Sequence, residues 1–154
     1  MLRRSPGGTR ARGFTLIEVL VALVVMAVGM LGIASLYLYG LREGRSAVYR
    51  TAAVTLASDM ADRIRANPAG TYDGAGPGAD NSCVNGGVDC APEELAADDW
   101  ARWLADLDER MPQDSTATIE ADLSAPPIVE YRITITWPEP GQAAPPSYSL
   151  AMQL

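Results

Sequence analysis

Histidine and lysine are absent from this chain of 154 residues, and only two cysteines are present. Without histidine, the chain lacks the side chain that most often serves as a general base near neutral pH. Two cysteines alone supply too few ligands for an ordinary zinc site, and no glycine-rich phosphate-binding motif occurs. We therefore expect no enzyme activity, no metal and no cofactor.

Two acidic pairs, Glu93-Glu94 and Asp98-Asp99, are the remaining candidates for acid–base chemistry. Neighbouring carboxylates can act as a general acid and a general base. Both pairs flank the expected start of a helix, where acidic side chains favour the positive end of the helix dipole. We expect all four side chains to be solvated, so no catalytic constellation is predicted.

Basic charge is scarce and unevenly placed. All 12 basic residues are arginine, against 19 acidic residues, and four of the arginines precede Phe14. A chain that began at Phe14 would carry 8 arginines against 19 acidic residues, a net charge of −11. Such acidity argues against a nucleic-acid partner, which requires a basic patch. Basic flanks of a membrane segment stay in the cytoplasm, so we expect the N-terminus inside and the acidic remainder outside.

A long apolar run covers residues 14–41 and contains one early carboxylate, Glu18. At about 1.5 Å per residue the run is long enough to cross a bilayer as a helix. An acidic side chain in hydrocarbon costs about 2.5–3.5 kcal/mol, so Glu18 is expected to have a function and a cationic partner. A cut after Gly13 would create such a partner, because the new amine of Phe14 would lie four residues from Glu18 on the same helical face. The amine of a neighbouring copy could equally be the partner.

Two simpler explanations of this N-terminus are a secretory signal and a plain membrane anchor. A secretory signal cut after Ala34 would leave Ser35 as the first residue, and an anchor would keep Met1. Neither explains a glutamate at the start of an apolar run. N-terminal sequencing separates these alternatives from a cut that leaves Phe14 first.

Residues 12–18, Arg-Gly-Phe-Thr-Leu-Ile-Glu, resemble the class III signal of type IV pilins and type II secretion pseudopilins. The resemblance implies that a prepilin peptidase cuts the bond between Gly13 and Phe14 on the cytoplasmic side and N-methylates Phe14. It also implies that Glu18 is the glutamate used in assembly. No catalytic residue is implied.

The same resemblance implies three segments of chain. Residues 1–13 would form a cytoplasmic leader peptide, and residues 14–41 the transmembrane and assembly half of the N-terminal helix. Residues 42–154 would form a periplasmic globular domain that includes the second half of this helix. The protein would be a single-pass bacterial inner-membrane protein that later enters the pilus fibre.

The sequence of residues 42–154 predicts an α+β, pilin-like fold. Apolar residues recur at helical spacing from Tyr49 to Ile64, and Asn67-Pro68 ends the pattern, so one helix is predicted from about residue 14 to 66. A second, shorter helix begins near Pro92, with an apolar stripe that includes Trp100 and Trp103. We expect both tryptophans in the core, in preference to a sugar-binding platform.

Three runs with a period of two follow, in which every second residue is apolar. They predict three antiparallel strands packed by one face onto the long helix. Pro126-Pro127 and residues 138–146 separate them. The residues expected to face inward are Ala117, Ile119, Ala121 and Leu123, then Val129, Tyr131, Ile133, Ile135 and Trp137, and finally Tyr148, Leu150, Met152 and Leu154.

Between the helices, residues 68–91 are rich in glycine, proline, asparagine and aspartate, and they are predicted to form a long loop. Cys83 and Cys90 lie within it, separated by six residues. In an exported domain this spacing favours one local disulfide, worth about 2–3 kcal/mol by loop closure. The alternative interpretation of the two cysteines is a metal site.

Several later segments resemble the PilV family of minor pilins, the type IV pilus modification proteins. They are residues 63–68, the cysteine pair, residues 99–107 and residues 131–137. The resemblance implies a structural subunit that joins other minor pilins to prime pilus assembly and is carried at the tip. Its implied partners are prepilin peptidase, the other minor pilins, the major pilin, a large tip adhesin and inner-membrane lipid. The implied roles are adhesion and twitching motility.

Two other functions fit the same sequence. A minor pseudopilin of a type II secretion system would share the helix, Glu18 and the peptidase. A membrane-anchored periplasmic binding module would use Trp100, Trp103 or the loop to touch a ligand. The proteins that co-purify distinguish the first alternative, and absence from sheared pilus fractions distinguishes the second.

Overall fold

The computed structural model describes residues 13–74, 76–84, 88–124 and 128–154. Residues 1–12, with the four arginines of the predicted leader, and Pro126-Pro127 lie outside the described residues. The chain divides into two compact units, Met1–Glu43 and Gly44–Leu154, and each is considered by itself. Helix α1, Leu16–Ala66, contributes residues to both.

Helix α1 confirms the predicted long helix and starts two residues later than expected. Thr15 caps it: its carbonyl oxygen accepts the N–H groups of Glu18 and Val19 at 3.1 and 3.3 Å, and its Oγ1 also accepts the Glu18 N–H at 3.3 Å. At the other end the Asn67 N–H bonds to the Arg63 carbonyl, and Pro68 then stops the helix.

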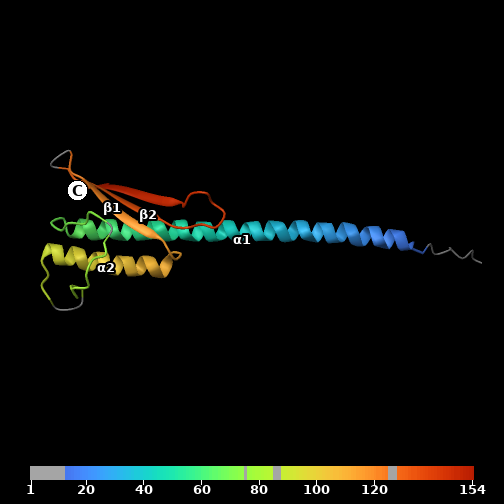
Figure 1. The fold of residues 1–154 in the computed structure, drawn as a ribbon, viewed down its shortest axis with the longest axis horizontal. Helices are drawn as coiled ribbons and strands as arrows, with labels where there is room; N and C mark the ends of the chain where they lie inside the picture. The colour runs from blue at the N-terminus through green and yellow to red at the C-terminus, as the bar shows by residue number, and fades with distance from the viewer. Residues whose placement is uncertain (1–12, 75, 85–87, 125–127) are drawn as a thin grey trace, which may run out of the picture. The chain divides into compact units, whose positions relative to one another are not determined.

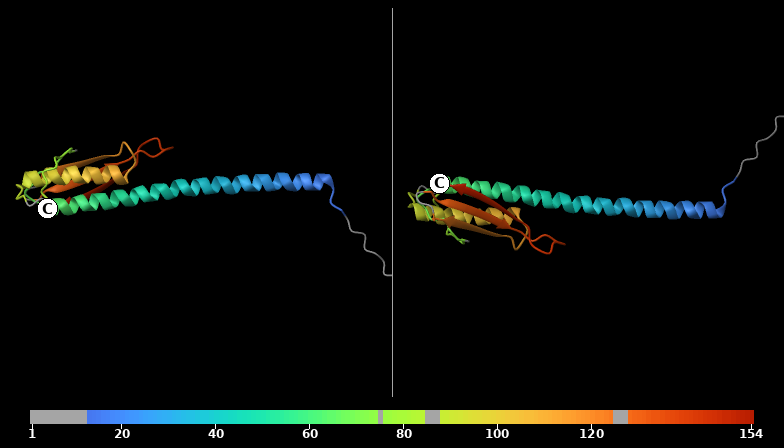
Figure 2. Two further views of the ribbon diagram at one scale, coloured as in Figure 1. Left: turned by 90° about the horizontal axis from the view of Figure 1, so that it is seen from below. Right: turned by 90° about the horizontal axis from the view of Figure 1, so that it is seen from above.

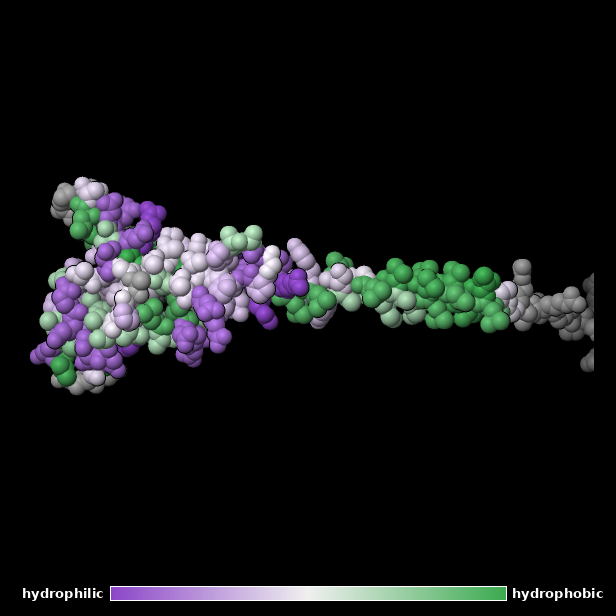
Figure 3. Space-filling view, in the orientation of Figure 1, coloured by the Kyte–Doolittle hydropathy of each residue, from purple (hydrophilic) through white to green (hydrophobic). Residues whose placement is uncertain are grey.

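In the first unit, α1 is apolar and uncovered. By length and composition, α1 is the helix among the described residues that could cross a membrane, and no residue of its most apolar stretch is buried by the described chain. Figure 3 shows an almost continuous hydrophobic surface along this part of the helix. Exposed side chains include Leu16, Leu20, Val24 and Leu31.

The second unit combines the C-terminal half of α1 with α2, Pro92–Arg110, and a sheet. Strands β1, Thr116–Asp122, β2, Glu130–Thr136, and β3, Ser147–Gln153, pair antiparallel in the order β1-β2-β3. Within this unit the sheet and α2 lie against α1, as the ribbon views show (Figures 1 and 2). The predicted α+β, pilin-like fold is confirmed.

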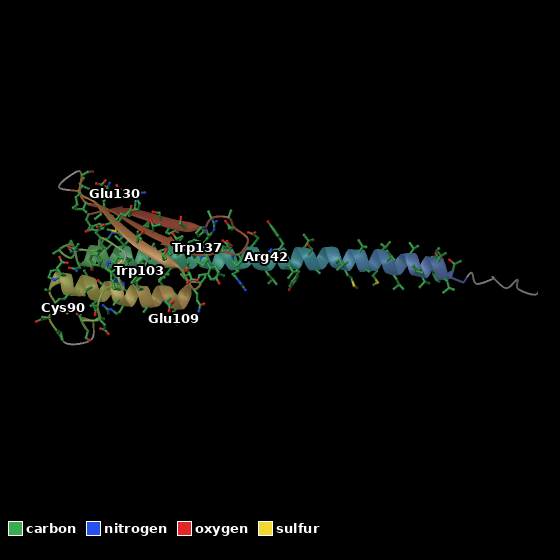
Figure 4. All side chains as sticks on the ribbon, viewed as in Figure 1. Arg42, Cys90, Trp103, Glu109, Glu130 and Trp137 are labelled. Carbon is green, nitrogen blue, oxygen red and sulfur yellow. A yellow bond between two sulfur atoms is a disulfide. The ribbon has the colours of Figure 1, made fainter. Side chains whose placement is uncertain are left out.

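The core of the second unit confirms both predicted helical faces. Buried residues of α1 are Ala53, Leu56, Ala57, Met60, Ala61 and Ile64. From α2, Trp103 is fully buried and donates its indole N–H to the Leu56 carbonyl at 2.8 Å, while Trp100 donates to the Tyr72 carbonyl at 3.1 Å. Trp103 and Trp137 both lie within the globular unit in Figure 4. The tryptophans are therefore core residues that join α2 to its neighbours.

The predicted alternation of the strands is confirmed at the centre of the sheet and wrong at one end. Ile119, Ile133 and Ile135 are at most 1% exposed, whereas Leu123 is 68% exposed and Leu154 is 39% exposed. Leu123 and Leu154 were expected on the inner face, but β1 ends at Asp122 and β3 at Gln153, so the pleat no longer determines which way these two side chains point.

The expectation that Asp98 and Asp99 are solvated is also wrong. They are 1% and 7% exposed. Asp98 forms an ion pair with Arg102 and accepts the Asn81 N–H at 2.9 Å. Asp99 lies on α2 beside the stripe that carries the tryptophans, and it accepts a hydrogen bond from Tyr72, in the loop that precedes α2. Burial with charged and polar partners makes both carboxylates part of the structure of the second unit.

The loop after α1 contributes to the core, which its composition did not indicate. Tyr72 is fully buried, and its hydroxyl donates to Asp99 at 2.8 Å. Gly74 exchanges two backbone hydrogen bonds with Ile119, at 2.8 and 2.7 Å. Gly78 has φ +74° and packs so closely on α2 that a Cβ there would collide with the Ala97 carbonyl oxygen. The loop therefore covers α2 and the outer edge of β1.

Tyr72 predicts a loss of stability at alkaline pH. Burial and the hydrogen bond to Asp99 raise the pKa of Tyr72 above its ordinary value of 10.0. The stability that this phenol contributes is complete below the unfolded pKa and is lost as the pH rises through the folded pKa. We expect the urea midpoint, followed by tryptophan fluorescence, to fall above pH 10, and Tyr72→Phe to make that fall shallower. Burial also raises the pKa of Tyr131, so Tyr131→Phe is the control that should keep most of the slope. An equally steep fall in Tyr72→Phe would contradict the assignment.

Candidate processing and assembly site

The residues on either side of the expected cut lie just before α1. Phe14 is 83% exposed, and a Cβ added at Gly13 would meet no heavy atom within 4 Å. Neither residue packs against the described remainder of the chain. An enzyme could therefore reach the Gly13–Phe14 bond without first unfolding α1.

Phe14 and Glu18 are brought together on one side of the helix. They line one shallow surface depression with four apolar residues, which are Val19, Ala22, Leu23 and Met26. Phe14 precedes the first residue of α1, yet it lies on the side expected for a residue four before Glu18 in a helix. An amine created on Phe14 could thus face the Glu18 carboxylate of its own chain, or both groups could meet their counterparts on an adjacent helix.

Helix capping does not account for the Glu18 carboxylate. Thr15 and Glu18 have the spacing of a capping box, a signal that the sequence analysis missed, and Thr15 Oγ1 accepts the Glu18 N–H. A carboxylate in the first turn gains about 0.3–1 kcal/mol from the helix dipole. Its insertion into hydrocarbon costs about 2.5–3.5 kcal/mol, so the helix dipole does not offset this cost. Glu18 forms no ion pair with any described residue. The difference in free energy favours a cationic partner, which the amine created on Phe14 of the same or an adjacent chain would supply.

The two cysteines form a disulfide, Cys83–Cys90, with a Cα–Cα distance of 5.7 Å. Their sulfur atoms are thus bonded to each other and are not available to a metal. Among the described residues, no group of three or more potential metal ligands occurs. Next to the disulfide, Asn81 donates its side-chain amide to the Glu94 carbonyl at 2.9 Å and attaches this part of the loop to α2.

A cluster of charged residues joins α1, the loop and α2. Arg63 contacts Asp59 at 2.9 Å, Asp99 at 3.3 Å and Asp106 at 3.8 Å. Burial lowers the pKa of Arg63, but the carboxylates of Asp59 and Asp99 outweigh this effect, so the pKa is raised above its ordinary value. The Arg63 guanidinium stays charged, and the Tyr72 phenol, which bonds to Asp99, has a raised pKa. Both groups hold segments of the chain together and are poorly suited to proton transfer at neutral pH.

Residues 8–34 match the sequence family described as the prokaryotic N-terminal methylation motif. The match includes Gly13, Phe14 and Glu18, and residues 8–12 of it lie outside the described part of the structure. No curated protein and no solved structure matches the chain significantly.

The methylation motif and the α+β fold support a protein of the type IV pilin-like or pseudopilin class. The motif implies processing by a prepilin peptidase and assembly with other pilins. It favours a structural subunit over an enzyme, and the exposed apolar helix that follows it fits anchoring in the inner membrane.

Proposed function

We propose that this chain is a minor pilin of the PilV type, a structural subunit that helps to prime assembly of a type IV pilus. The observation that carries the proposal is the methylation motif of residues 8–34, which continues into an apolar helix that nothing in the described chain covers. A helix of this kind needs either lipid or other helices around it, and a pilin uses each in turn.

In the proposed sequence of events, residues 1–13 stay in the cytoplasm as the leader, residues 14–41 cross the inner membrane, and residues 42–154 fold in the periplasm. Prepilin peptidase then cuts the bond between Gly13 and Phe14 and methylates Phe14. Glu18 pairs with the Phe14 amine of an adjacent subunit as the apolar helices bundle, which offsets the cost of its burial and sets the axial register. The fibre then carries the subunit at its tip.

The partners in this proposal are the peptidase, the other minor pilins, the major pilin, a large tip adhesin and the lipid of the inner membrane. Adhesion and twitching motility would follow from the fibre as a whole. A minor pseudopilin of a type II secretion system carries the same motif, so the fibre that contains the chain decides between them. Affinity purification of the mature protein should recover pilus subunits; recovery of secretion pseudopilins would favour the alternative.

Replacing Glu18 should separate assembly from insertion. Glu18→Ala removes the carboxylate while leaving the apolar run intact, so the protein should reach the membrane in normal amount and its quantity in sheared fibres should fall at least tenfold. Immunoblots of membrane and fibre fractions measure both. Glu43→Gln, at another exposed carboxylate of α1, is the matched control and should assemble normally. Normal incorporation of Glu18→Ala would refute the assembly role.

A further inference from the structure

Strand β3 presents a row of backbone groups to the outside of the sheet. Val129 and Leu154 exchange two backbone hydrogen bonds, at 3.3 and 3.0 Å, and the Trp137 N–H bonds to the Pro146 carbonyl at 3.1 Å. Bonded residues alternate along an antiparallel pair, so the even-numbered residues of β3 bond to β2. The odd-numbered residues direct their N–H and C=O groups away from β2; they are Ser147, Ser149, Ala151 and Gln153.

The opposite edge of the sheet is partly covered by the chain itself. On β1, Gly74 occupies both backbone groups of Ile119, and the Asp73 carboxylate accepts the Ala121 N–H at 2.8 Å. For β3, by contrast, none of the hydrogen bonds formed by described residues involves the outward backbone groups of residues 147, 149, 151 and 153. The sheet thus has one covered edge and one open edge.

The open edge also lacks the features that usually protect such strands. Proteins block free edges with charges, prolines, glycine bulges or covering segments. Strand β3, Ser-Tyr-Ser-Leu-Ala-Met-Gln, has none of these side chains, and residues 142–154 contain no charge. The covered strand β1 carries Glu120 and Asp122. The open edge is thus neutral although the protein as a whole is negatively charged, and a neutral edge favours pairing with another strand.

We propose that β3 binds an extended strand of another pilin-like subunit, a proposal that rests on the proposed function. Outward groups that recur every second residue, about 6.4–6.8 Å apart, match the backbone of a second strand. Ser149 and Ala151 are exposed, so the added strand should carry small or polar side chains beside them. Tyr148 and Leu150 are only partly buried, so the added strand should carry apolar side chains beside these two.

A second copy of this chain fits the edge less well than another subunit does. Figure 2 shows β3 running roughly along the second half of α1. Two β3 strands paired antiparallel would direct these halves of their α1 helices oppositely, whereas copies inserted in one membrane share one orientation. This argument disfavours antiparallel pairing of two copies, and the proposal commits to a strand from a different subunit of the same assembly as the occupant.

Site-specific photo-crosslinking in cells that assemble the fibre tests this. A photoreactive phenylalanine replaces Ser149 in the full chain, and Thr118, exposed on the same face of the sheet but on β1, is the control position. We expect an adduct from position 149, mapped by mass spectrometry to an extended segment of another chain with an N-terminal methylation motif, and at least tenfold less from position 118. No adduct, equal adducts at both positions, or an adduct to a second copy or to a chain without the motif would each overturn the proposal.

A second variant separates edge binding from folding. Ala151→Pro removes an N–H that points outward and leaves the ladder to β2 intact, so the fold should tolerate it. When Ala151→Pro is combined with the photoreactive residue at position 149, the adduct should fall at least tenfold while the urea midpoint stays near that of the parent. Ala151→Lys, which adds a charge to the edge, should have the same effects. An undiminished adduct in both variants would refute edge pairing. If the chain enters fibres but forms no adduct, this inference alone is refuted. If the chain forms the adduct but never enters fibres, the proposed function alone is refuted.

Discussion

Replacing Gly13 by tryptophan is expected to leave the chain at its full translated length. A peptidase that cuts directly after glycine needs a site too narrow for a large side chain, so cleavage should fall at least tenfold. Intact-mass measurement of the membrane-extracted protein would show a precursor that retains residues 1–13 and an unmethylated Phe14. Because the uncut chain would offer no free Phe14 amine to the Glu18 carboxylate of an adjacent subunit, the same variant should also be missing from fibres.

The structure makes this result interpretable. A Cβ at Gly13 meets no atom of the described chain within 4 Å, so we expect the substitution to leave the described fold intact. Gly13→Ala is the matched control, and it should be processed to a large extent, though more slowly. A fully mature mass for Gly13→Trp, with Phe14 as first residue, would show that glycine is not required there. If the wild type, like Gly13→Trp, were found only at precursor length, this bond would not be the cut site.

Periodicity explains what could be predicted from the sequence. Both helices and all three strands have one buried face, and burial of a face imposes a regular spacing on apolar residues. Ala53, Leu56 and Met60 on α1 and Ile133 and Ile135 on β2 are at most 2% exposed for that reason. The candidate processing site is likewise local, since Gly13, Phe14 and Glu18 lie within six consecutive residues.

Contacts between distant segments explain what could not be predicted. Tyr72 bonds to Asp99 across 27 residues and Asp73 to Ala121 across 48, and no local spacing records either pair. Tyr72 is the single aromatic residue in residues 68–91, which was the available signal that part of this polar loop enters the core. Without it, Asp99 could not be distinguished from a solvated carboxylate on the second helix.

Removing the Asp99 carboxylate should destabilise the second unit strongly. Asp99 accepts hydrogen bonds from Arg63 and Tyr72, and its side chain is 9% exposed. Asp99→Ala leaves the fully buried Tyr72 hydroxyl without this acceptor and removes one of the carboxylates beside Arg63. Breaking a buried charged pair by removing one partner costs about 3–5 kcal/mol. Arg63 keeps its contacts with Asp59 and Asp106, so we expect a loss at the lower end of this range, about 3 kcal/mol. Urea unfolding of the detergent-solubilised protein, followed by the fluorescence of its buried tryptophans, measures the change.

Asp62→Ala is the matched control, because Asp62 also pairs with an arginine of α1 but is 77% exposed. A surface ion pair of this kind contributes about 0.2–1 kcal/mol, so the two variants should differ severalfold in their loss of stability. Equal, small losses would mean that Asp99 is solvated after all, as its sequence suggested. Since Asp99 belongs to the second unit and Gly13 to the first, Asp99→Ala should still be cut and methylated at Phe14. A folding defect with normal maturation would thus separate the two parts of the chain, and the signal would be shown to act independently of the domain it delivers.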